Sequence, residues 1–147
     1  MSYPKLTFTL LCAALCAVGM GANAVDNSRR IINTPPSHLE WKVTDEGVGF
    51  APLQGDRFNE AYMAMVKLPA GLVSPSHIKS SSMYGLVVSG VLVHVANGLS
   101  SEEVELPAGS FYKIPAGLAH VSQCISKVDC ITFLYQDGKF DFLPVER

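Results

Sequence analysis

The sequence has little charge of either sign and no excess of basic residues. Its 147 residues include 11 Lys and Arg against 13 Asp and Glu, a net charge of −2, and only 16% of them are charged. Proteins that hold a nucleic-acid backbone or an anionic membrane surface need a basic field, so we expect neither partner. A disordered chain is also excluded, because 48% of the residues are hydrophobic.

Hydrophobic runs long enough to cross a membrane are absent as well. The longest uncharged apolar stretch, residues 6–20, follows Lys5 and is shorter than the roughly 20 residues that span a bilayer. Ala22 and Ala24 then stand at the two positions that a signal peptidase inspects. We therefore predict a cleaved signal peptide over residues 1–24. The protein is then expected to be periplasmic or secreted, with no membrane attachment after cleavage.

Cysteine is scarce, and only two of the four cysteines, Cys124 and Cys130, follow the predicted signal peptide. Export implies an oxidising compartment. The five residues between the two cysteines are a hairpin-loop spacing, which lets them face each other across two strands. We predict a disulfide. The alternative is that Cys124 is a free thiol with a chemical role.

Amphipathic helical periodicity is missing after the signal, whereas short runs rich in Val, Leu, Tyr and Phe recur between turn sequences. Strands are expected over residues 61–68, 84–89, 91–95, 111–114 and 131–135. Asn97-Gly98 and Asp137-Gly138 are strong signals for tight hairpins. The pattern predicts an all-β sandwich or barrel. We expect one such domain over residues 38–147, preceded by an extended proline-containing arm over residues 25–37.

Two stretches place glycine and histidine at fixed intervals. In the first, gaps of five, one, three and six residues separate Gly71, His77, Lys79, Met83 and Gly90. In the second, gaps of five, one, two and three residues separate Gly109, Pro115, Gly117, His120 and Cys124. Both series resemble the paired motifs of the cupin superfamily. Those motifs have His at the position of Lys79, Glu at that of Met83 and Asn at that of Cys124.

The resemblance implies a jelly-roll β-barrel with a site inside it. Residues 133–142 also resemble the ending of small exported cupins of unassigned function, and the chain is similar to cupins with three histidines that act as diketone-cleaving dioxygenases. Carried over residue by residue, the motifs imply His77 and His120 as metal ligands. Residues 77 and 79 have the same parity along a strand, so both are expected to point inward.

The substitutions leave the chemistry of this site open. Lys79 has no lone pair while it is protonated, and the Met83 thioether is a soft ligand. The predicted ligand-binding set is therefore His77, Lys79, Met83 and His120.

Three interpretations of the site follow. In the first, His77 and His120 hold one divalent transition metal (iron, zinc, manganese or copper) for a dioxygenase-like reaction on a small carbonyl compound. A third ligand would then come from elsewhere. His94 is the spare imidazole, although we expect it to face solvent. In the second, the barrel is a metal-free binding module or sensor in which Lys79 supplies charge for a small anion or carbonyl compound. In the third, a free Cys124 joins His77, Met83 and His120 in a soft copper site.

A fourth interpretation is a scaffold without catalytic function. Open sheet edges invite pairing between chains, so we expect a homodimer.

Overall fold

The computed structural model describes residues 30–98 and 103–145. The predicted signal peptide lies outside these residues. One compact unit begins at Thr34, and residues 30–33 belong to a separate one. Pro36–His38 form a single turn of 3-10 helix, so the end of the predicted arm is not fully extended. In the described part of the chain, no helix is long and apolar enough to cross a membrane.

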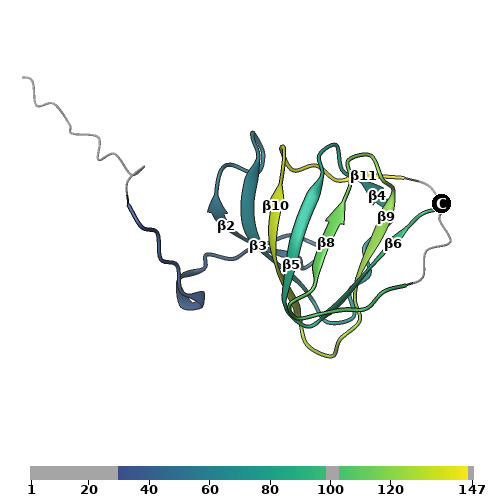
Figure 1. The fold of residues 1–147 in the computed structure, drawn as a ribbon, viewed down its shortest axis with the longest axis horizontal. Coiled ribbons are helices and arrows are strands. Elements are labelled where there is room, and N and C mark those ends of the chain that lie inside the picture. Colours follow the sequence, from purple (N-terminus) through teal and green to yellow (C-terminus); the bar gives the residue numbers. More distant parts are fainter. Residues whose placement is uncertain (1–29, 99–102, 146–147) are drawn as a thin grey trace, which may run out of the picture. The chain divides into compact units, whose positions relative to one another are not determined.

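The unit consists of two antiparallel sheets, which confirms the all-β prediction (Figure 1). The six-stranded sheet has the order β1 (Lys42–Val43), β2 (Gly49–Gln54), β3 (Tyr62–Leu68), β10 (Cys130–Gln136), β5 (Met83–Ser89) and β8 (Phe111–Ile114). The five-stranded sheet has the order β11 (Leu143–Pro144), β4 (His77–Ile78), β9 (His120–Cys124), β6 (Val91–Ala96) and β7 (Leu106–Pro107).

The five expected strands are all present, with ends that differ by at most one residue. The two expected tight hairpins are not. After Asn97-Gly98 the chain reaches β7, which pairs with the start of β6 at Val91 and Leu92 and not with its end. After Asp137-Gly138 it enters β11, which belongs to the other sheet. Asn97-Gly98 makes a turn and Asp137-Gly138 a bend, but in neither case do the flanking strands pair directly across it.

The alternation of buried and partly exposed residues along the central strands supplies the side chains of the core. Along β10 every second residue is buried, and the inward set includes Thr132, Leu134 and Gln136. The two polar members are hydrogen-bonded, as burial requires. The Tyr62 hydroxyl donates to Gln136 Oε1 at 3.1 Å, and the Thr132 hydroxyl donates to the Leu86 carbonyl at 2.9 Å.

Two glycines allow close approaches that a side chain would block. A Cβ on Gly85 would lie 2.1 Å from Cζ of Tyr112, so the tyrosine ring covers bare backbone there. Gly90 lies at the point where the chain passes from the six-stranded to the five-stranded sheet. It has a φ of 78°, and its Cβ would lie 2.8 Å from Cα of Cys130. Its left-handed backbone and tight contact both require glycine.

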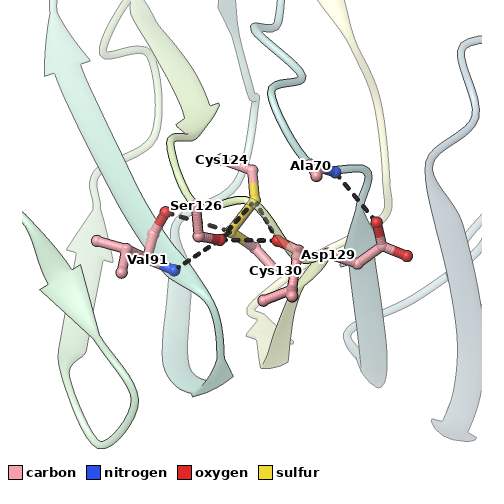
Figure 2. Close-up of a disulfide and its surroundings, with 7 residues drawn as sticks. Ala70, Val91, Cys124, Ser126, Asp129 and Cys130 are labelled. Atoms are coloured by element: carbon pink, nitrogen blue, oxygen red, sulfur yellow. Dashed lines mark hydrogen bonds between the residues drawn. A yellow bond between two sulfur atoms is a disulfide. The ribbon is translucent and has the colours of Figure 1, made fainter.

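The disulfide between Cys124 and Cys130 confirms the predicted pair (Figure 2). It joins the end of β9 to the start of β10 and so connects the two sheets, with a Cα–Cα distance of 5.7 Å. Ser126 supports the loop between them. Its hydroxyl donates to the Val128 carbonyl at 2.7 Å and accepts from the Val91 amide at 3.2 Å. A copper site with a free Cys124 thiol is therefore wrong.

Candidate functional site

A cavity of about 560 Å³ lies between the two sheets. Its wall is mainly apolar, with side chains such as Phe50, Val66, Leu92 and Leu134. Polar side chains make up a small part of its surface, and they belong to Thr44, Glu46, Tyr62, Ser74, His77, Lys79, His94, Tyr112, Ser122, Thr132 and Gln136. Few polar groups on an apolar wall are typical of a site for a small organic molecule.

Backbone pairing brings the predicted histidines together. His77 in β4 lies opposite His120 in β9, and their ring centroids are 4.3 Å apart. The segment that precedes β4 is tied to β9, because the Ser74 amide donates to the Ser122 carbonyl at 2.9 Å. The outer face of the His77 ring stacks on Phe142 at 4.1 Å. His77 lines the cavity, whereas His120 lies beside His77 and is not among the lining residues.

His94 faces inward, so the expectation that it faces solvent is wrong. It pairs with Ser122 across β6 and β9, which places it diagonally from His120 on the same face of the sheet. Nδ1 of His94 lies 2.9 Å from the Ser122 hydroxyl, and its ring packs on Tyr112 with centroids 4.4 Å apart. Three imidazoles thus occupy three adjacent strands on the inner face.

Hydrogen bonds set the tautomers of the two facing histidines. Nδ1 of His77 donates to the Pro75 carbonyl, and Nδ1 of His120 donates to the Leu118 carbonyl, both at 2.9 Å. Each Nε2 atom therefore carries a lone pair in the neutral ring. Nε2 of His120 and Nε2 of His94 are both buried without a hydrogen-bond partner in the described part of the chain.

Burial keeps these imidazoles neutral. The pKa of His77 is lowered to about 4, mainly by loss of water, with smaller contributions from the nearby His120 and Lys79, and the hydrogen bond to the Pro75 carbonyl opposes this shift. Loss of water also lowers the pKa of His94 to about 4, with smaller contributions from His120 and His77. The pKa of His120 is lowered for the same main reason. At neutral pH the site therefore offers imidazole acceptors and no imidazolium.

Lys79 supplies the cationic group of the site. Its side chain is 5% exposed and lines the cavity. The ammonium lies 4.0 Å from the ring centroid of Phe140 and 5.1 Å from that of Phe142, and it donates to the backbone carbonyl of Asp141. The Lys79 carbonyl accepts from the Gly117 amide at 2.8 Å, which fixes the backbone under the side chain.

The charge on Lys79 is not fully compensated. The pKa of Lys79 is lowered to about 8, mainly by burial; Asp141 opposes this shift and the nearby Arg57 guanidinium adds to it. The Asp141 carboxylate accepts from the Ser80 amide at 3.0 Å, so part of its capacity is used there. An anionic or carbonyl oxygen in the cavity would therefore improve the surroundings of the ammonium.

These residues do not fit the metal site of the cupin motifs. Lys79 places an ammonium where the second imidazole stands, and Met83 is part of the apolar core beside Tyr62 and Leu134. Within residues 30–98 and 103–145, no group of three or more His, Cys, Asp or Glu side chains is placed to hold a metal ion. The assignment of a metal to His77 and His120 stays a prediction.

The sequence reasoning misplaced His94 and missed Phe140 and Phe142. His94 lies between Val93 and Val95, so both faces of β6 are apolar and its alternation does not reveal which face is inside. Phe140 and Phe142 follow the last long strand, where no periodicity applies. Their spacing around Asp141 was the available signal, because alternate aromatics place two rings on one side of an extended chain.

Comparison with known families assigns the chain to one of them. A family model described as a domain of unknown function, DUF4437, matches residues 34–147. The chain belongs to this family. No curated protein sequence matches it.

Solved structures similar to this member of the family share its cupin fold. KdgF from Halomonas sp. is 16% identical with a TM-score of 0.59, over 74% of this chain and 94% of its own. The polyketide cyclase RemF from Streptomyces resistomycificus is 13% identical with a TM-score of 0.64, over 80% and 87%. An RmlC-like cupin from Shewanella frigidimarina is 17% identical with a TM-score of 0.56, over 71% and 88%. At these identities the likeness shows the cupin fold, as the motif spacing predicted.

Proposed function

We propose that the barrel is a metal-free binding site for a small, largely apolar carbonyl or carboxylate compound that also carries a hydroxyl group. The observation that carries this proposal is the buried Lys79 ammonium on the wall of a mainly apolar cavity. A cavity of about 560 Å³ lies within the usual range for small-molecule sites.

The hydrogen-bonding capacity of the site sets the chemistry of the ligand. Lys79 is a donor, so it is suited to a carbonyl or carboxylate oxygen. His77 exposes an acceptor at Nε2, because its Nδ1 is bonded to Pro75, and a ligand hydroxyl is the matching donor. The remaining surface is aromatic and aliphatic, which matches an apolar body.

Salicylate and benzoate test this proposal, since they share a carboxylate and differ by one hydroxyl. We expect calorimetric titration at pH 7 to show binding of both, with salicylate tighter. The variant Lys79→Met should bind either at least tenfold more weakly, about 1.4 kcal/mol. Lys67→Met is the matched control, because Lys67 also lies over an aromatic ring, that of Trp41, but does not line the cavity. Equal affinity of the wild type and Lys79→Met would contradict the proposal.

Elemental analysis of untagged protein separates this proposal from a metal-dependent reaction on a small carbonyl compound. We expect less than stoichiometric iron, zinc, manganese or copper. Any metal that is bound should be lost in His77→Ala and His120→Ala, because these two imidazoles have free Nε2 lone pairs. One tightly held metal ion per chain would contradict the metal-free proposal.

We also propose export and homodimer formation. Export rests on the signal-like residues 1–24, and sequencing the N-terminus of the protein from the medium or periplasm tests it.

Dimer formation is supported by the outer face of the six-stranded sheet, where Leu86 pairs with Phe111 and the two side chains are 45% and 64% exposed. The second copy would cover this apolar row. Light scattering of the wild type and of Leu86→Lys tests it, since a monomeric wild type would contradict it.

A further inference from the structure

The position that departs most from the cupin motifs carries a primary amine inside the barrel. Lys79 is two residues after His77, and both are inward-facing and about 5% exposed or less. The ammonium is held between the faces of two aromatic rings and one backbone carbonyl, so its direction toward the cavity is defined. The cupin motifs have a metal-binding histidine at this position. In this chain the position carries the nucleophilic amine of Lys79, which lines the cavity.

The side chain of Lys79 is almost fully removed from bulk water. The apolar wall removes water, and the Arg57 guanidinium adds a repulsive charge from the loop between β2 and β3. The Asp141 carboxylate, on the segment that leads to β11, has the opposite charge and attracts the ammonium. The amine is thus shielded from bulk water on a mainly apolar wall, with the rings of Phe140 and Phe142 beside it.

Groups that move protons are also within the site. Nε2 of His77 is an acceptor, because its Nδ1 donates to the Pro75 carbonyl, and the side chains of His77 and Lys79 line the same cavity. An aldehyde or ketone bound with its oxygen toward Lys79 would present its carbonyl carbon to Nζ. Amine catalysis of this kind needs a desolvated lysine, a carbonyl group and a nearby proton acceptor.

We propose that Lys79 forms an imine with a small aldehyde or ketone bound in the cavity. The lone pair of the neutral amine forms the C–N bond, and the π electrons of the C=O bond move to oxygen. The two amine protons are transferred to that oxygen, with His77 relaying them, and the oxygen leaves as water. The step consumes no oxidant or reductant. It rests on the proposed function for the binding of the carbonyl compound and adds a covalent bond to it.

Salicylaldehyde with sodium cyanoborohydride tests this step on the full mature protein, in the presence of EDTA. The reductant converts an imine into a stable secondary amine, which intact-protein mass spectrometry counts and peptide mapping locates. Lys67 and Lys113 serve as controls within the same molecule. Each lies over an aromatic ring, at 4.6 Å from Trp41 and 5.4 Å from Tyr84, and neither lines the cavity.

We expect Lys79 to be modified at least tenfold faster than Lys67 and Lys113, and the variant Lys79→Met to lose the fast adduct. Protection of Lys79 by excess salicylate in the wild type gives a second measurement that does not depend on the folding of a variant. Equal rates at the three lysines, or an unmodified Lys79, would overturn the inference.

The two proposals fail in different ways. If salicylate binds but no fast adduct forms at Lys79, the proposal of imine formation is wrong and the proposed binding site stands. If a fast adduct forms at Lys79 but salicylate does not bind, the proposed ligand class is wrong and the nucleophilic role of Lys79 stands.

Discussion

Replacing Lys79 with methionine should stabilise the barrel at pH 7 and flatten the dependence of its stability on pH. Methionine has a similar length and no charge, so it fills the same space beside Phe140 and Phe142. In the wild type the folded state must hold a buried ammonium whose pKa falls from 10.5 to about 8. That difference corresponds to about 3 kcal/mol of destabilisation of the charged form.

The sign of the effect follows from the two protonation equilibria. Below pH 8 both the folded and the unfolded chain bind the proton, so the full cost of the buried charge is present. Between pH 8 and 10.5 the unfolded chain binds more protons than the folded one, so stability rises with pH. Between pH 7 and 9.5 the wild type should gain about 2 kcal/mol from this group.

Two buried tyrosines act in the opposite direction only at higher pH. Burial raises the pKa of Tyr112 to about 12 and that of Tyr62 further, so both stay neutral in the fold. The unfolded phenols ionise near pH 10, which lowers stability above that value. Measurements at pH 7 and 9.5 therefore isolate most of the contribution of Lys79.

Urea unfolding of the oxidised protein measures the change. At pH 7 we expect Lys79→Met to be about 2 kcal/mol more stable than the wild type, because the loss of the hydrogen bond to Asp141 offsets part of the gain. At pH 9.5 the two proteins should differ by less than about 1 kcal/mol. Lys67→Met controls for the removal of a lysine charge outside the cavity. A variant that is less stable than the wild type at both pH values would refute the reasoning.

Four further results are expected. Thiol titration of the unfolded, unreduced protein should find no free thiol after residue 24. Reduction of Cys124–Cys130 should lower the free energy of unfolding by about 2.4 kcal/mol, the loop-closure value for so short a loop, and an unchanged urea midpoint would contradict this. Gly85→Ala should destabilise the fold by more than about 2 kcal/mol, because its Cβ would overlap the Tyr112 ring, and a thermal midpoint equal to that of the wild type would argue against that contact. Lys79→His adds an imidazole beside His77 and should bind zinc at least tenfold more tightly by calorimetry, about 1.4 kcal/mol, whereas equal affinities would mean that residue 79 does not face the site.

Local patterns in the sequence were enough for much of this protein. Runs of β-forming residues located the long strands, since strand preference and alternation act over a few neighbouring positions. The intervals around His77 and His120 predicted the cupin fold, and the two histidines do meet on paired strands. The spacing of Cys124 and Cys130 predicted their disulfide, because a short loop limits how far apart the two residues can lie.

The tertiary structure alone decided which groups surround the site. His94 turned inward because β6 pairs with β9 in a register that no local pattern in a run of valines can specify. Asn97-Gly98 and Asp137-Gly138 did not close tight hairpins, because the strand after the first pairs with the opposite end of β6 and the strand after the second belongs to the other sheet. The surroundings of Lys79 came from Phe140, Phe142 and Arg57, which are distant from it in sequence. Burial and the charges of such distant neighbours set the chemistry of an amine, and only the folded chain brings them together.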